Sequence, residues 1–63
     1  MIEFWRSLDT MGKDRLRVLV SKSTDCALST VDKYGTGAVN PSAKKKAKIK
    51  QIAAKHFDVA IEF

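Results

Sequence analysis

Residues 20–41 read VSKSTDCALSTVDKYGTGAVNP, and this stretch decides how we expect the chain to fold. Small or apolar residues recur along it at the spacing at which one helix ends, the chain turns sharply and a second helix crosses the first. They are Val20, Ser21, Thr24, Cys26, Val31 and Tyr34. Ser23, Thr24 and Asp25 have short side chains that compete for backbone hydrogen bonds and favour turns over helix interiors. The pattern therefore predicts a helix-turn-helix with its turn near Asp25.

The same stretch resembles the helix-turn-helix of the Cro and lambda-repressor-like family. A small residue, a turn residue, a buried aliphatic and a large buried apolar residue keep a fixed spacing in that family, and the matching residues here are Ser21, Asp25, Val31 and Tyr34. Further similarities are Ser29-Thr30-Val31, Gly37, Pro41-Ser42 and Lys48-Ile49. Ser21, Asp25 and Arg17 stand where the family usually has Ala, Gly and Gln. The resemblance implies an all-α, four-helix Cro-like domain with its motif at about residues 17–37 and a short C-terminal tail at 58–63.

Length and composition agree with one small domain. A chain of 63 residues buries only about 60% of its unfolded surface, so it depends on compact helices or on a partner. Cys26 is the only cysteine, which excludes an internal disulfide and fits a reducing compartment. No apolar run is long enough to span a bilayer, and the opening MIEFWRSLD carries an acid among its apolar residues, unlike a secretion signal. We therefore expect a cytoplasmic protein.

The formal net charge of +5 is unevenly placed. Residues 33–57 contain seven lysines and no acidic residue. Such a stretch is an electrostatic footprint for a polyanion, although lysines on the outer face of a helix are also compatible with a simple solvated surface.

Two helices are expected before the turn. Residues 2–8 place apolar side chains at near-helical spacing, with Phe4 and Trp5 in the core because so small a domain needs its large side chains inside. Asp9 can cap the next helix, which begins at about Thr10. Its expected inner stripe is Leu16, Leu19, Val20 and Ser23, and the expected outer residues are Lys13, Asp14, Arg17 and Lys22.

Two more helices are expected after the turn. Residues 27–34 predict a short, outward helix that Gly35 and Gly37 end. Asn40 or Ser42 caps the last helix, with Pro41 near its first turn. The expected inner residues of these two helices are Val31 and Tyr34, then Ala47, Ile49, Ile52, Ala53 and Phe57.

Residues 58–63, DVAIEF, alternate apolar and polar positions and are rich in strand formers. Three alternatives stay open for this tail. It packs irregularly along the bundle, it begins another helix, or it pairs with the same strand of a second chain to make a dimer.

No catalytic constellation is visible. His56 is the only histidine and is expected at the surface. Cys26 is expected to be a small core residue because it lies at a position that the motif buries, and a nucleophilic cysteine would need a base beside it. The aspartates are explained as caps, turn residues or surface charges. We expect no enzyme, no metal site and no cofactor.

The resemblance implies a sequence-specific regulator of transcription that binds double-stranded DNA, of the small repressor type and acting as a homodimer. In the family, the helix after the turn lies in the major groove, which implies base contacts here at Ala27, Leu28, Ser29 and Lys33. The phosphate-contact candidates are Arg17, Asn40, Lys44, Lys45 and Lys46.

Two other classes of function remain open. One is a protein-binding module, such as an antitoxin or a phage-encoded modulator, with Trp5, Val59 and Phe63 as its contact. The other is a non-specific basic nucleic-acid binder.

Overall fold

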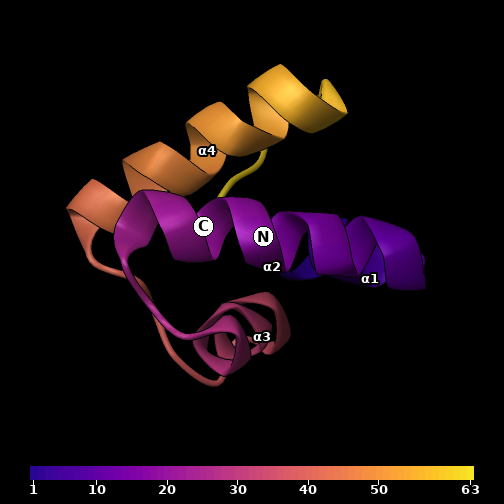
Figure 1. Ribbon diagram of the computed structural model, residues 1–63. Coiled ribbons are helices and arrows are strands. Elements are labelled where there is room, and N and C mark those ends of the chain that lie inside the picture. Colours follow the sequence, from indigo (N-terminus) through magenta and orange to yellow (C-terminus); the bar gives the residue numbers. More distant parts are fainter.

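The computed structural model describes all of residues 1–63 and contains four helices and no strand. The helices are α1 (Ile2–Ser7), α2 (Thr10–Thr24), α3 (Leu28–Thr36) and α4 (Ala43–Phe57). Helix α2 lies between α4 and α3, and α3 is seen nearly end-on while α2 crosses the view (Figure 1). The expected all-α class is confirmed. None of the four helices combines the length and apolar character needed to cross a membrane.

Side-chain caps start the two long helices. The Asp9 carboxylate accepts a hydrogen bond from the Gly12 amide at 2.7 Å, as predicted. The Ser42 hydroxyl accepts one from the Lys45 amide at 3.3 Å, so Ser42 rather than Asn40 caps α4. Both caps satisfy backbone donors that have no partner inside their helix.

Left-handed residues end three helices. Asp25 closes α2 and Asp58 closes α4, with φ of 53° and 55°, and Gly37 closes α3 with φ of 85°. The prediction that Gly35 also ends α3 is wrong. Gly35 lies inside that helix and is buried under the Trp5 ring. A Cβ at this position would stand 2.3 Å from the ring, so there is no room for a side chain. The glycine lets α1 pack directly on α3.

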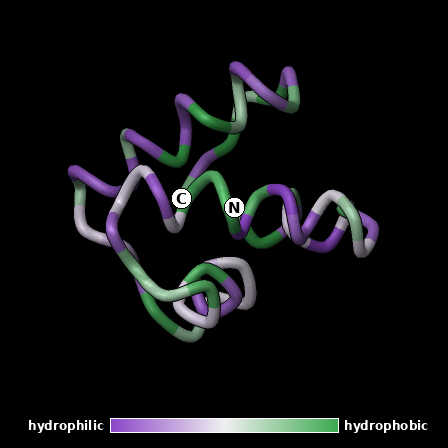
Figure 2. Tube along the Cα trace, viewed as in Figure 1, coloured by the Kyte–Doolittle hydropathy of each residue, from purple (hydrophilic) through white to green (hydrophobic).

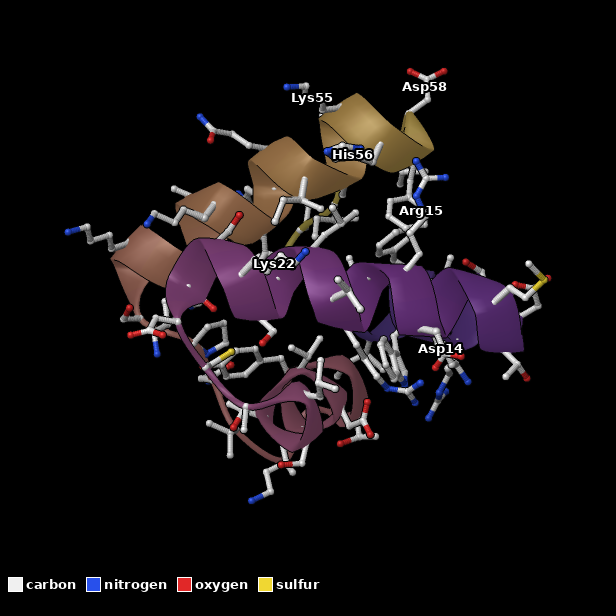
Figure 3. All side chains as sticks on the ribbon, in the orientation of Figure 1. Asp14, Arg15, Lys22, Lys55, His56 and Asp58 are labelled. Atoms are coloured by element: carbon white, nitrogen blue, oxygen red, sulfur yellow. The ribbon has the colours of Figure 1, made fainter.

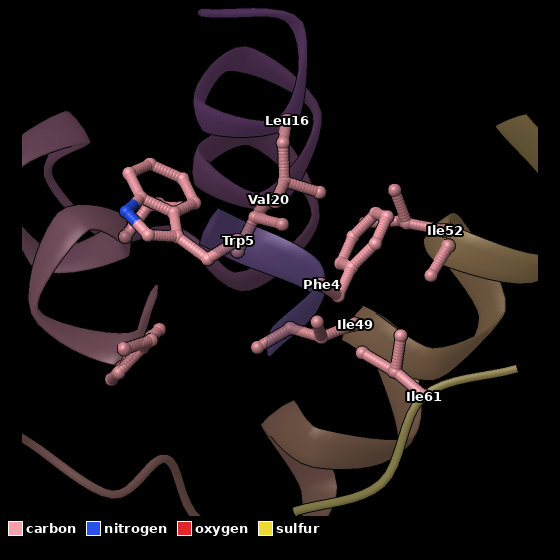
Figure 4. Packing of buried hydrophobic residues seen from close by; sticks show 10 residues of the cluster. Phe4, Trp5, Leu16, Val20, Ile49, Ile52 and Ile61 are labelled. Atoms are coloured by element: carbon pink, nitrogen blue, oxygen red, sulfur yellow. The ribbon is translucent and has the colours of Figure 1, made fainter. Parts of the chain in front are cut away.

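The core joins all four helices and the tail (Figure 4). Its ten buried residues are Phe4, Trp5, Leu16, Val20, Val31, Tyr34, Ile49, Ile52, Ala53 and Ile61. The Phe4 ring meets the Phe57 ring edge to face, with 5.5 Å between centroids. Along α4 the hydrophobic positions turn toward α2 and the hydrophilic positions turn outward (Figure 2). The predicted core roles of Phe4 and Trp5 are confirmed.

A few predicted orientations are wrong. Ser23 and Ala47 were predicted to face the core but are exposed. The buried residues are only Leu16 and Val20 on α2, and Ile49, Ile52 and Ala53 on α4. Lys13 and Arg17 were expected to face water but are partly covered, since both cations lie over the Trp5 ring. Pro41 precedes the α4 cap and is buried instead of occupying the first turn.

The tail packs along the bundle without regular structure, which is the first of the three alternatives. Ile61 is only 6% exposed and belongs to the core. The amino group of Met1 donates a hydrogen bond to the Glu62 carbonyl oxygen, and the two chain ends lie close together (Figure 1). The alternative of a further helix is wrong.

Candidate nucleic-acid interface

A short, hydrogen-bonded turn fixes the direction in which α3 leaves α2. Asp25 is left-handed, and the next amide, that of Cys26, donates to the Ser21 carbonyl oxygen at 3.3 Å. The Ser21 hydroxyl donates back to the Cys26 carbonyl oxygen at 2.6 Å. The Thr24 hydroxyl lies 3.1 Å from the Cys26 sulfur. The small residues of the predicted motif therefore hold the turn through hydrogen bonds as well as through their size.

Helix α3 is anchored by one face only. Val31 and Tyr34 are buried, as predicted, whereas Leu28 is 50% exposed. Ser29 and Lys33 are exposed and, being four positions apart, are neighbours on the outer face of α3. The base-contact candidates Ala27, Leu28 and Ser29 come together at the start of α3. Lys33 lies about 6 Å further along the helix axis than Ser29.

Arg17 differs from the other phosphate-contact candidates, because its guanidinium is already occupied within the domain. It forms ion pairs with Asp32 of α3 and Asp14 of α2, and it lies over the Trp5 ring at 5.3 Å from the centroid. The hydrogen bond to Asp32 raises the pKa of Arg17 above its ordinary value against the opposing effect of desolvation. Arg17 therefore ties α2 to α3, a role that the sequence did not reveal.

Helix α4 carries six lysines and no acidic residue. Three of them, Lys44, Lys45 and Lys46, stand in its first turn, where the positive end of the helix dipole opposes cations. Lys44 and Lys45 have no ion pair or other side-chain partner, and Lys46 lies over the Phe63 ring at 5.7 Å. Asn40 is exposed in the loop just before this turn. The structure thus gathers Asn40, Lys44 and Lys45 at the start of α4.

The remaining lysines of α4 fall on two sides of the helix. Lys50 lies 3.8 Å from the Glu62 carboxylate in the tail. Lys48 donates a hydrogen bond to the Ser23 carbonyl oxygen at 3.0 Å, near the end of α2. Lys55 is exposed and makes no ion pair.

The predicted protein-contact residues do not form one surface. Trp5 is 6% exposed and packs against Gly35, so its expected role in a partner contact is wrong. Val59 and Phe63 are 37% and 41% exposed. Both border an apolar groove of about 650 Å³ between α1, the end of α3 and the tail.

Side chains typical of catalytic and metal sites are dispersed. No three of the His, Cys, Asp and Glu residues come close enough to hold a metal ion. His56 is exposed, as predicted, and Cys26 is partly buried beside Thr24.

Comparison with known proteins adds no relative from which a function could be transferred. No protein-family model, no curated protein and no solved structure matches the chain. Its function must therefore be argued from its own residues.

Proposed function

We propose that the chain is a small, repressor-type regulator that binds double-stranded DNA sequence-specifically through α3. The observation that supports the proposal is that α3 is fixed to the domain by its turn and by one buried face, while its first turn stays exposed. A left-handed turn at Asp25 sets its direction, Val31 and Tyr34 anchor its inner face, and its first turn is left exposed. An exposed helix held in this way fits the width of a DNA major groove, and the arrangement agrees with the resemblance to the Cro-like motif.

The outer face of α3 has side chains suited to base edges. Lys33 can donate to the acceptor atoms of guanine, and Ser29, its neighbour on the helix, can donate or accept. Leu28 and Ala27 can contact the methyl group of thymine. Of these four side chains only Lys33 is charged, so most of the electrostatic attraction must come from elsewhere in the domain.

The start of α4 supplies that attraction in our proposal. Lysines in the first turn of a helix cost about 0.3–1 kcal/mol each through the helix dipole, so local stability does not explain Lys44 and Lys45. A phosphate bound there would meet these side chains together with the free backbone amides of the first turn. Asn40 is placed to join them, and a second copy of the chain would read a second half-site.

The test compares Lys33→Ala with Lys45→Ala. Duplexes selected by the protein from a random library would provide the preferred site, and affinities would be measured on that site and on random duplex over a range of salt concentrations. We expect Lys33→Ala to cost about 1–3 kcal/mol on the preferred site, to relax preference at one base pair and to affect random duplex less. We expect Lys45→Ala to weaken both duplexes alike and to reduce the salt slope by about one unit.

The comparison also separates the proposal from its competitors. Equal losses on every sequence from both substitutions would mean that α3 does not read bases. Unchanged DNA binding in both variants would reject a nucleic-acid role and favour a protein partner.

A non-specific nucleic-acid binder is the second candidate, and the distribution of charge favours it. Helix α4 has six lysines, whereas the single lysine of α3 is accompanied by Asp32, whose charge Arg17 neutralises. Such a protein would bind random duplex, single strands and RNA with similar affinity and the same steep dependence on salt.

A further inference from the structure

Helix α3 carries an acid, Asp32, beside the side chains proposed to contact bases. Asp32 follows Ser29 by three positions and Leu28 by four, so the three side chains are neighbours on the surface of α3. The Asp32 side chain is 42% exposed. An acid on a helix that approaches phosphates lowers affinity through repulsion. Its presence at this position therefore needs a separate reason.

The stability of the domain does not supply that reason. Asp32 stands in the second turn of α3, whereas an acid benefits from the helix dipole in the first turn. Its ion pair with Arg17 is partly exposed, and such pairs contribute little to stability. The buried side chains of Val31 and Tyr34 already fix α3 to the domain.

Arg17 holds the Asp32 carboxylate in one orientation. The Nε of Arg17 donates to the Oδ1 of Asp32, and the guanidinium is itself fixed by its ion pair with Asp14 and by the Trp5 ring beneath it. Lys13 also lies over the Trp5 ring, at 5.5 Å from the centroid. Two acids and two cations thus gather around one ring, and their formal charges cancel.

This cluster lies on the side of α2 that faces α3. Asp14 is on the lower side of α2 in Figure 3, where α3 lies, and Arg15 is on the opposite side, toward α4. The cluster therefore borders the helix that is proposed to enter the major groove.

The second oxygen of the Asp32 carboxylate is free to accept a hydrogen bond. Arg17 bonds to Oδ1, and no hydrogen bond within the domain reaches Oδ2. An ionised carboxylate can only accept, and in the major groove it suits the exocyclic amino group of cytosine. Guanine and thymine present acceptor oxygens there, which a carboxylate repels, and adenine has an acceptor nitrogen beside its amino group.

We propose that Asp32 reads a cytosine in the preferred site through its free oxygen, and that Arg17 is the positioning residue that orients and neutralises the carboxylate. The inference rests on the proposed function, because it assigns a specificity-determining residue to the same helix. It also gives Arg17 a role other than a phosphate contact. Asp32 would favour cytosine both by accepting its hydrogen bond and by repelling bases that offer only acceptors.

The first test compares Asp32→Ala with its matched control, Asp14→Ala. Both substitutions remove an acid that pairs with Arg17 and change the net charge equally, but only Asp32 lies on α3. Each protein selects sites from a random duplex library, and affinities are then measured for all four bases at each position of the recovered site. Thermal melting confirms that each variant is folded.

We expect the intact chain and Asp14→Ala to prefer cytosine about tenfold at one position of the site. Asp32→Ala should lose this preference and bind random duplex as tightly or more tightly, because a negative charge is removed. General weakening on all sequences, with the cytosine preference retained, would mean that Asp32 only supports the fold and would overturn the inference.

A modified base tests the hydrogen bond directly. N4-methylcytosine still pairs with guanine, but a methyl group replaces the amino hydrogen that faces the major groove. At the selected position it should weaken binding of the intact chain about tenfold and leave Asp32→Ala nearly unaffected. Equal effects on the two proteins would overturn the inference.

A second test separates the role of Arg17 from that of a phosphate contact. Arg17→Gln should reduce the cytosine preference and weaken binding to every sequence about tenfold, because the Asp32 carboxylate is no longer oriented or neutralised. The same substitution should weaken binding much less in the Asp32→Ala background. Equal losses in both backgrounds, with a salt slope lower by about one unit, would make Arg17 a phosphate contact and overturn its positioning role.

The outcomes also distinguish this inference from the proposed function. A library that returns no preferred site would overturn both. A preferred site with the same bases for the intact chain and for Asp32→Ala would overturn the inference alone.

Discussion

At the scale of single residues, two positions define how closely the helices approach. The Trp5 ring of α1 packs against the backbone of Gly35 in α3, and there is room for the ring because glycine has no side chain. Asp25 is the left-handed hinge between α2 and α3. One position requires the absence of a side chain, and the other requires a backbone conformation that most residues avoid.

Gly35→Ala should lower the free energy of unfolding by about 1–3 kcal/mol, because its Cβ would overlap the Trp5 ring. The better helix propensity of alanine offsets part of this loss, by about 0.5–1 kcal/mol. Urea unfolding measures the change. The matched control is the same substitution in a Trp5→Phe background, where a smaller ring should make it less costly. A stabilised Gly35→Ala variant would show that α1 does not pack on α3 in this way.

Asp25→Gly should leave stability unchanged or raise it by up to about 1 kcal/mol, because glycine adopts the left-handed conformation without strain. The Asp25 side chain is exposed and forms no ion pair that would be lost. Asp25→Val is the control and should be strongly destabilising, since a β-branched residue is poorly tolerated at positive φ. If Asp25→Gly instead lost more than about 1 kcal/mol, the carboxylate would have a stabilising contact of its own.

At the scale of elements, sequence patterns predicted the all-helical class and the approximate positions of the four helices. Periodic apolar residues predicted the four helices and the buried roles of Val31 and Tyr34, because those signals depend only on local spacing. Errors arose where a neighbour distant in sequence decides the outcome. Gly35 reads locally as a helix stop, yet Trp5 requires it within the helix.

The candidate site was predictable to a similar extent. The exposure of Leu28, Ser29 and Lys33 follows from helical periodicity. The engagement of Arg17 does not, since it depends on Asp32, fifteen residues away across the turn.

Helix α4 should show a trade-off between stability and binding at its first turn. Lys44→Glu should raise the free energy of unfolding by about 0.5–1 kcal/mol, because an acid suits the positive end of the helix dipole. The same substitution should weaken duplex binding and lower its salt slope. Lys55→Glu is the opposite control, since it places an acid in the last turn, where the dipole disfavours it. Equal stability effects at the two ends would show that the dipole does not explain the cost of Lys44.

At the scale of the whole molecule, the tail completes a core that four short helices leave open. Ile61 joins residues of α1 and α4 in one cluster, and the Met1 amino group holds the Glu62 carbonyl oxygen. A domain of 63 residues buries little apolar surface and is only marginally stable. Burial of Ile61 in the tail should therefore contribute to the free energy of unfolding of the whole domain.

Ile61→Ala should therefore destabilise the whole domain, by about 2–4 kcal/mol, because it opens a cavity between α1 and α4. For so small a chain each kcal/mol corresponds to roughly 4–8 °C in Tm, so thermal melting should show a drop of about 10 °C or more. Val59→Ala is the matched control, since Val59 is 37% exposed and its truncation should shift Tm far less. Well below the melting transition, Ile61→Ala should bind the preferred duplex nearly as the intact chain does, because the proposed base contacts lie on α3 and Lys44 and Lys45 make no ion pair with the tail. Only Lys46, which lies over the Phe63 ring, and Asn40, which borders the same groove as the tail, are near the substitution. Similar shifts in both variants would mean that the tail is only loosely placed, and the core would then have to be completed by a second chain.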